Sequence, residues 1–329
     1  MKTALFVALL LSGVGEATAD EAFRVGLPVA CAFGSMCSVQ NYFDLDPGPG
    51  RLDPACGRLS YDGHDGTDIR VRDLVAMREG VGVVAAAAGV VKATRDGMAD
   101  VSVRGTGPEA VVNREAGNGV LIDHGGGWET QYSHLRSGSV LVNPGDQVEA
   151  GTPLGMIGLS GNTEFPHLHF TVRKDGVEID PYTGAAGAWT CGSSKSPLWT
   201  EDAAKVLVYV PTGLLIAGFS STPPEADAIR RGDGRLGESV QDPDVLVLWA
   251  DIFGAQAGDI QSFRITGPGG SVVMDDESVL DANNVSWFAF GGRRRPPQGW
   301  VPGGHAGTFT LVRGGETIIS ESVEIEITR

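Results

Sequence analysis

Short apolar runs separated by Gly, Pro, Asn and Asp recur along the whole chain, and no long helical pattern interrupts them. Runs of this kind are typical of strands joined by tight turns. The 48 glycines among the 329 residues supply the positions that such turns need. The sequence therefore predicts a mainly β protein, and its length predicts two domains at roughly 150 residues each.

The strand-like runs fall into two groups, separated by a Gly- and Ser-containing stretch at 184–197. We predict a first domain over 61–195 and a second over 198–329. A hairpin is expected where Gly314 and Gly315 separate the runs 308–312 and 317–328. We predict that the second domain is an immunoglobulin-like β-sandwich of unknown function. The runs are 82–87, 90–94, 119–124 and 168–173 in the first group, and 205–210, 214–219, 245–252, 261–266, 286–290, 308–312 and 317–328 in the second.

The first nineteen residues have the pattern of a secretory signal peptide. Lys2 precedes an apolar run at 4–11, and Ala17 and Ala19 form an A-x-A cleavage site. Residues 20–60 read as an irregular, Pro- and Gly-rich segment. No later segment offers the ~18 apolar residues of a transmembrane helix. From the signal peptide we expect an exported protein, periplasmic or extracellular.

Charge and cysteine content narrow the function classes further. The formal net charge of −16 argues against a nucleic-acid partner, which requires a basic surface. The four cysteines form no C-x-x-C pair, and in an exported protein an even count predicts two disulfides with three possible pairings. Of these we favour Cys31–Cys37, which closes a small loop, and Cys56–Cys191.

Five of the six histidines fall between residues 64 and 169. His64 and Asp68 lie four residues apart in the glycine-containing segment H-D-G-T-D, where an extended or turning backbone is expected. His167 and His169 occupy a strand-like P-H-L-H-F segment and share one face of it. His134 lies in the third element, Y-S-H-L. Two imidazoles and one carboxylate would give three ligands with an open fourth position, which is the pattern of catalytic zinc.

The order of these elements resembles the lysostaphin/LytM-type zinc endopeptidases, the peptidoglycan DD-metallopeptidase family. The signature of that family is H-x-x-x-D, then Y-x-H-L, then P-H-L-H-F. The resemblance covers roughly residues 61–183. It implies an antiparallel β-sheet with a groove bounded by loops, and hydrolysis of peptide cross-links in peptidoglycan.

The resemblance also implies roles for single residues. His64, Asp68 and His169 would bind one Zn²⁺ per chain, and His134 and His167 would be catalytic histidines that act as general base and as oxyanion or transition-state stabilisers. Two departures leave substrate preference open. One is the N-T-E-F loop at 162–165, and the other is the long insertion at 95–117.

Two alternatives to an active enzyme remain. The chain could be a catalytically silent, wall-binding regulator of other cell-wall hydrolases, or its second domain could dock it to a wall or protein ligand. We expect His124 to be structural, His305 to be a solvated loop residue and the arginine run 293–295 to be a solvated loop.

Overall fold

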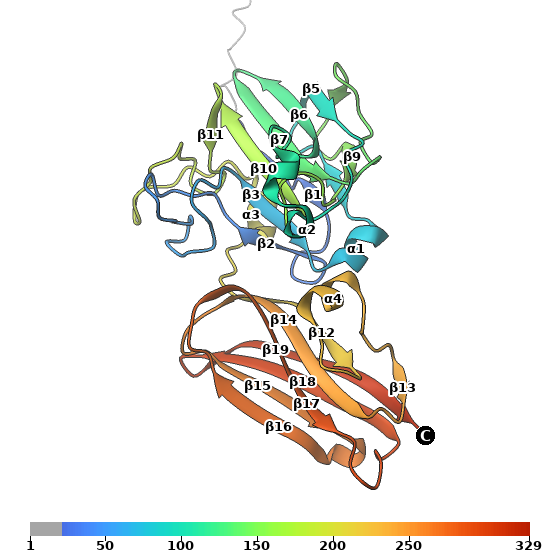
Figure 1. Cartoon of the computed structure of the whole chain (residues 1–329). Coiled ribbons are helices and arrows are strands. Elements are labelled where there is room, and N and C mark those ends of the chain that lie inside the picture. Colours follow the sequence, from blue (N-terminus) through green and yellow to red (C-terminus); the bar gives the residue numbers. More distant parts are fainter. Residues whose placement is uncertain (1–21) are drawn as a thin grey trace, which may run out of the picture.

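The protein is described by a computed structural model that covers residues 22–329 (Figure 1). The predicted signal peptide lies outside the described residues. Within 22–329 the chain is mainly β, as predicted, and forms two β regions that follow each other in sequence. In that part of the chain, no helix has the length and apolar character needed to cross a membrane.

The first region is built on an eight-stranded sheet in the order β2-β3-β10-β7-β6-β5-β8, with β11 paired to β10. A small sheet, β1-β4-β9, packs beside it through a shared apolar core. The bounds are β1 Val29–Ala30, β2 Cys37–Asn41, β3 Thr67–Val71, β4 Gly82–Val84, β5 Gly89–Arg95, β6 Asn118–Gly125, β7 Trp128–Leu135, β8 Gln147–Val148, β9 Pro153–Met156, β10 His167–Lys174 and β11 Val177–Ile179. The helices are α1 Leu74–Glu79, α2 Val103–Thr106, the 3-10 turn η1 Pro108–Val111 and α3 Glu201–Val206.

The centre of this sheet is rigid because its middle strands are buried. Every residue of β3 is buried, and Ile69, Leu168 and Phe170 have no exposed surface. Tyr132 of β7 is also fully buried and packs against Phe170. Fully burying such side chains contributes about 1.5–3 kcal/mol each. The adjacent strands β3, β10 and β7 therefore form a fixed platform for the polar residues that they also carry.

Two predictions for the first region need correction. The segment 20–60 is less irregular than expected, because its described part supplies β1 and β2 and buries Tyr42 in the core. The predicted strand at 205–210 is wrong, since helix α3 occupies 201–206. Thr200 caps α3 by accepting from the Ala203 amide, and two acidic residues follow in its first turn. Trp199 and Leu207 then pack in the first core, past the expected boundary near 198.

The second region consists of two sheets, β12-β14-β17 and β13-β19-β18-β15-β16, with an apolar core between them. The predicted hairpin is present between β18 and β19. Gly314 and Gly315 have φ values of 58° and 88°, which glycine adopts without steric cost. The bounds are β12 Gly213–Ser220, α4 Ala226–Arg231, β13 Ser239–Gln241, β14 Val245–Ala255, β15 Ile260–Thr266, the 3-10 turn η2 Pro268–Gly270, β16 Val272–Val279, β17 Asn284–Arg294, β18 Gly303–Arg313 and β19 Glu316–Thr328.

Helix α4 of the second region contacts α1 of the first (Figure 1). The buried Asp73 carboxylate pairs with Arg235 at 2.9 Å across this contact. The Arg231 carbonyl accepts a hydrogen bond from Arg78 at 2.8 Å. Because the carboxylate of Asp73 is buried, separating it from Arg235 would leave a charge without a partner, which is strongly unfavourable. The contact therefore ties the second region to the first.

The disulfides pair as we favoured, Cys31 with Cys37 and Cys56 with Cys191, and the described residues contain no free cysteine. The second bond spans 135 residues and the first only 6. Since the entropy that a cross-link removes from the unfolded chain grows with loop length, Cys191→Ser should lower the free energy of unfolding by about 2–4 kcal/mol. Cys31→Ser should lower the free energy of unfolding by less, because its disulfide closes the shorter loop. Denaturant titration compares them, and equal losses would contradict the loop-length argument.

Candidate metal centre

The antiparallel register of β3 and β10 brings the predicted site residues together. Asp68 lies directly opposite His169, and Arg70 lies opposite His167. Residues opposite each other in such a pair project from the same face of the sheet. Because i and i+2 also share a face, His167 and His169 both project on the side that carries Asp68.

His64, Asp68 and His169 form a compact cluster. The Oδ1 atom of Asp68 lies 3.1 Å from His64 Nε2 and 2.9 Å from His169 Nδ1, and the two imidazole nitrogens are 3.2 Å apart. The three are the group of His, Cys, Asp and Glu side chains in residues 22–329 that could hold a metal ion. Gly66 is required beside them, because a Cβ there would lie 2.7 Å from His169 Nε2.

Each ligand candidate is oriented by a further hydrogen bond. His64 Nδ1 donates to the carbonyl oxygen of Tyr42 at 2.6 Å, which leaves its Nε2 lone pair directed at the cluster. Asn41 donates to Asp68 Oδ2 at 2.9 Å, so that Oδ1 remains available. His169 Nε2 donates to Asp65 Oδ1 at 3.0 Å, so that Nδ1 faces Asp68 and becomes a ligand atom when a metal ion replaces its proton. Such outer partners fix the tautomer and the direction of metal-binding groups.

The electrostatics of the cluster favour a positive charge at its centre. Burial alone would raise the pKa of Asp68, but the imidazoles of His64 and His167 hold it well below its usual value. Burial alone would lower the pKa of His169, but hydrogen bonds to Asp65 and Asp68 raise it to about 9. The carboxylates thus attract a cation to this point, and a metal ion can take the place of the proton.

His134 and His167 lie beside the cluster with their ring centroids 4.7 Å apart. His134 Nδ1 donates to the Ser160 carbonyl at 2.7 Å, so its Nε2 carries the lone pair. Burial, together with His167 and His169, holds the pKa of His134 well below its usual value, so the ring is neutral. His134 also has a φ of 63°, a conformation that costs a non-glycine residue about 1–2 kcal/mol.

His167 is fixed in a different way. Its Nδ1 donates to the Phe165 carbonyl at 2.9 Å, with the Thr163 hydroxyl 3.1 Å away. Its Nε2 lies 3.3 Å from Asp68 Oδ1, so a proton on Nε2 has an acceptor. The pair of histidines therefore offers one neutral lone pair and one potential donor next to the cluster.

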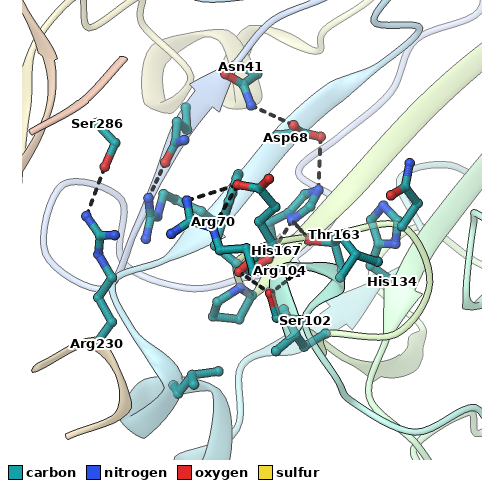
Figure 2. A pocket seen from close by; sticks show the side chains of 18 of the residues that line it. Asn41, Asp68, Arg70, Ser102, Arg104, His134, Thr163, His167, Arg230 and Ser286 are labelled. Atoms are coloured by element: carbon teal, nitrogen blue, oxygen red, sulfur yellow. Dashed lines mark hydrogen bonds and ion pairs between the residues drawn. The ribbon is translucent and has the colours of Figure 1, made fainter. Parts of the chain in front are cut away.

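A cleft of about 880 Å³ opens from this site (Figure 2). Asp68, His134 and His167 lie at one end of its lining. The insertion at 95–117 contributes α2 to its wall, where Ser102 donates to the Glu164 carbonyl at 3.1 Å. Helix α4 and Ser286 of the second region also line the cleft. The sequence had already linked the insertion to substrate preference, whereas the contribution of the second region was not expected.

The remaining histidines lie elsewhere. His124 bonds to Ala88 O at 2.7 Å and to Thr130 Oγ1 at 2.8 Å, as a structural residue would. His305 was expected in a solvated loop, and that prediction is wrong. It lies in β18, is only 2% exposed and has its ring beside Trp300, because β18 extends further toward the start of the chain than the apolar pattern showed.

A β-sheet platform with a buried His/Asp/His cluster and two further histidines at one end of a cleft defines a metallopeptidase-type domain. Residues 62–181 match the model of peptidase family M23, which assigns this part of the chain to that family. The metal-binding triad is the one typical of its zinc peptidases.

Three curated relatives illustrate the similarity. Peptidoglycan DD-endopeptidase ShyA of Vibrio cholerae is 34% identical over 132 residues, which are 40% of this chain and 25% of ShyA. Cell division protein DipM of Caulobacter vibrioides is 44% identical over 71 residues, 20% of this chain and 11% of DipM. Murein hydrolase activator EnvC of Escherichia coli is 37% identical over 62 residues, 19% of this chain and 14% of EnvC. The chain thus spans at most a quarter of these relatives.

Proposed function

We propose that this chain is an exported, zinc-dependent endopeptidase that hydrolyses peptide cross-links of bacterial peptidoglycan. The observation that carries the proposal is the cluster of His64, Asp68 and His169, whose Asp68 lines a cleft together with His134 and His167. The M23 domain and the name of ShyA support the substrate class. The two disulfides and the predicted signal peptide support export, to the periplasm or the exterior.

The donor set fits zinc. Three donors at bond lengths of about 2.0–2.1 Å around a tetrahedral ion would lie roughly 3.3–3.4 Å apart, close to the distances of 2.9–3.2 Å in the cluster. Nitrogen and carboxylate ligands together suit zinc, and three of them leave a fourth position open. When bound there, zinc supplies Lewis acidity and lowers the pKa of a water molecule to about 7. We assign His64, Asp68 and His169 as its ligands, one ion per chain.

The two remaining histidines have complementary roles in this proposal. His134 is held neutral with its lone pair on Nε2, so it can take the proton of the attacking water as a general base. His167 already carries a proton on Nδ1, so its doubly protonated form also has one on Nε2, and in that form it can donate a hydrogen bond to the oxygen on which negative charge develops. Both rings are fixed by carbonyl groups, which reduces the reorganisation needed during the reaction.

The main alternative is a catalytically silent regulator of other wall hydrolases. The similarity to EnvC, which is named as a murein hydrolase activator, is the observation that favours it. A silent regulator does not require residues that bind a metal ion, groups that orient those residues, or two further histidines beside them. The retention of His64, Asp68 and His169 together with His134 and His167 therefore favours the enzyme.

We also propose that the chain is divided into a peptidase domain built on 61–195, against which β1, β2 and α3 pack, and a β-sandwich of immunoglobulin-like type within 198–329. Two sheets of three and five strands around one core support the sandwich. The short strand β13 runs parallel to β19 at the edge of the larger sheet, while the other strand pairs of both sheets are antiparallel. A wall polymer or a protein would be the ligand of this domain.

The test is metal analysis together with digestion of purified sacculi. The mature protein should contain about one zinc per chain and should release muropeptides that mass spectrometry identifies as products of peptide hydrolysis. A chelator should stop the release, and added zinc should restore it. Protein that binds no zinc and releases nothing, but increases release by a separate wall hydrolase, would support the regulator.

A further inference from the structure

Arg70 is a buried arginine beside the metal centre that the proposed mechanism does not use. It lies on β3 two residues after Asp68, opposite His167 on β10, and only 3% of its surface is exposed. It nevertheless lines the cleft, on the same face as Asp68 (Figure 2). A guanidinium in this position would meet a bound substrate close to the reacting bond.

The contacts of Arg70 leave its charge without an anionic partner. Its Nη1 donates to the side-chain oxygen of Gln40, and its Nε donates to the carbonyl of Val71 at 3.3 Å. The guanidinium carbon lies 4.7 Å from the centre of the Phe165 ring. Among residues 22–329, no carboxylate forms an ion pair with it, although other arginines of the cleft form ion pairs of 2.7–3.6 Å.

The acidic groups nearby already have partners. Glu164 pairs with Arg104 at 2.9 Å, and Asp73 pairs with Arg235 at 2.9 Å. The buried Asp251 pairs with Arg230 at 2.7 Å. Arg70 is thus, within the described chain, a deeply buried arginine of the cleft lining that forms no ion pair with a carboxylate.

A buried charge of this kind is normally paired, since its removal from water costs several kcal/mol. A guanidinium offers five N–H donors in a planar fork that matches a carboxylate. Only two of the nitrogens of Arg70 have partners, and both partners are uncharged oxygens. The guanidinium therefore keeps donors free for an anionic group that enters from the cleft.

We propose that Arg70 binds a carboxylate of the substrate peptide and thereby sets substrate specificity. The inference rests on the proposed peptidase function and adds a requirement to it. Residues i and i+2 of a strand are about 6.6 Å apart, and an extended substrate advances about 3.3 Å per residue. For a substrate that extends along β3, the carboxylate that Arg70 recognises therefore belongs to a group about two residues from the bond that is cleaved.

The test compares a cross-linked muropeptide dimer with the same dimer whose carboxylates have been converted to primary amides. The full-length, zinc-loaded protein should hydrolyse the acid form with a kcat/KM about 10- to 100-fold above that of the amide form, as expected for a hydrogen bond to a charged group. In Arg70→Gln this preference should disappear, chiefly through the loss of activity on the acid form. Arg70→Lys, which keeps the charge but lacks the fork, should retain a smaller preference.

Arg104→Gln is the matched control, because Arg104 also lines the cleft but is exposed and already paired with Glu164. It should keep the preference of the unaltered protein. Equal rates for the two dimers in the unaltered protein, or an unchanged preference in Arg70→Gln or Arg70→Lys, would overturn the proposal. If Arg70→Gln does not fold, the unaltered protein and Arg70→Lys still decide.

Failure of the proposed function can be separated from failure of this inference. If the unaltered protein hydrolyses neither dimer, calorimetric binding of both dimers to the unaltered protein and to Arg70→Lys replaces kcat/KM. Tighter binding of the acid form that weakens in Arg70→Lys would support the role of Arg70 without catalysis. Equal binding of the two dimers would reject it.

Discussion

Asp68→Ala should empty the metal centre and abolish peptidoglycan hydrolysis, while the protein stays folded. The Oδ1 atom of Asp68 lies within 3.1 Å of both His64 Nε2 and His169 Nδ1, so its loss removes one of three ligands and the only negative one. Removing an outer-shell partner of a metal ligand already costs 10- to 100-fold in affinity. Loss of the ligand itself should cost more than about 100-fold. Zinc analysis after dialysis and muropeptide release measure the two effects.

Asp65→Ala is the matched control for this change. Asp65 is also a carboxylate of the H-D-G-T-D segment, but its side chain is 50% exposed and contacts only the outer nitrogen of His169. It should weaken metal binding by at most about 10- to 100-fold and leave measurable activity when zinc is in excess. An Asp68→Ala protein that keeps both zinc and activity would place the metal site elsewhere.

The metal triad could be predicted because its residues lie in two short segments, one that leads from a loop into β3 and one at the start of β10. The spacing of two residues between His167 and His169 fixes their common face in any strand. The spacing between His64 and Asp68 allows both to face one side, and the resemblance to a known family supplied the pairing between the segments. The structure then shows Asp68 opposite His169.

The groups that orient the ligands could not be predicted in the same way. Asn41 reaches Asp68 only because β2 pairs with β3, and β2 lacks the alternation of apolar and polar residues that would mark a strand. The role of Tyr42 depends on its backbone carbonyl, which carries no sequence signal. Long-range strand pairing and main-chain atoms are thus the two limits of prediction here.

The cleft shows a third limit, which is packing between the two regions. Helix α4 buries Ile229 on one side, and its other side carries one aspartate and two arginines that line the cleft. A helix of six residues is too short to show a clear helical period in the sequence. The misjudged strand at 205–210 has the same cause, since Val206, Val208 and Val210 suggest a strand whereas Thr200 caps a short helix. Short helices are set by their caps and by packing more than by periodicity.

His134→Ala and His167→Ala should each be inactive but loaded with zinc, whereas His169→Ala should be inactive and poor in zinc. His134 Nε2 is a neutral lone pair held by the bond from Nδ1 to Ser160, and His167 approaches only Asp68 among the three ligand candidates. His169, in contrast, contacts both Asp68 and His64. Loss of a general base or of an oxyanion donor typically lowers the rate by about 10²- to 10⁴-fold without removing a metal ligand.

The comparison between His167 and His169 tests the assignment most directly, because the two residues share a strand and a face. Side-by-side zinc analysis and rate measurements on the three variants separate ligands from proton carriers. If His167→Ala loses zinc while His169→Ala keeps it, the roles of the two histidines are reversed. If all three variants retain both zinc and hydrolysis, the reaction takes place at another site. Burial lowers the pKa of His134, so this residue is already neutral at pH 7 and can act as a base there. His134→Ala should therefore reduce the rate at pH 7 without changing the zinc content.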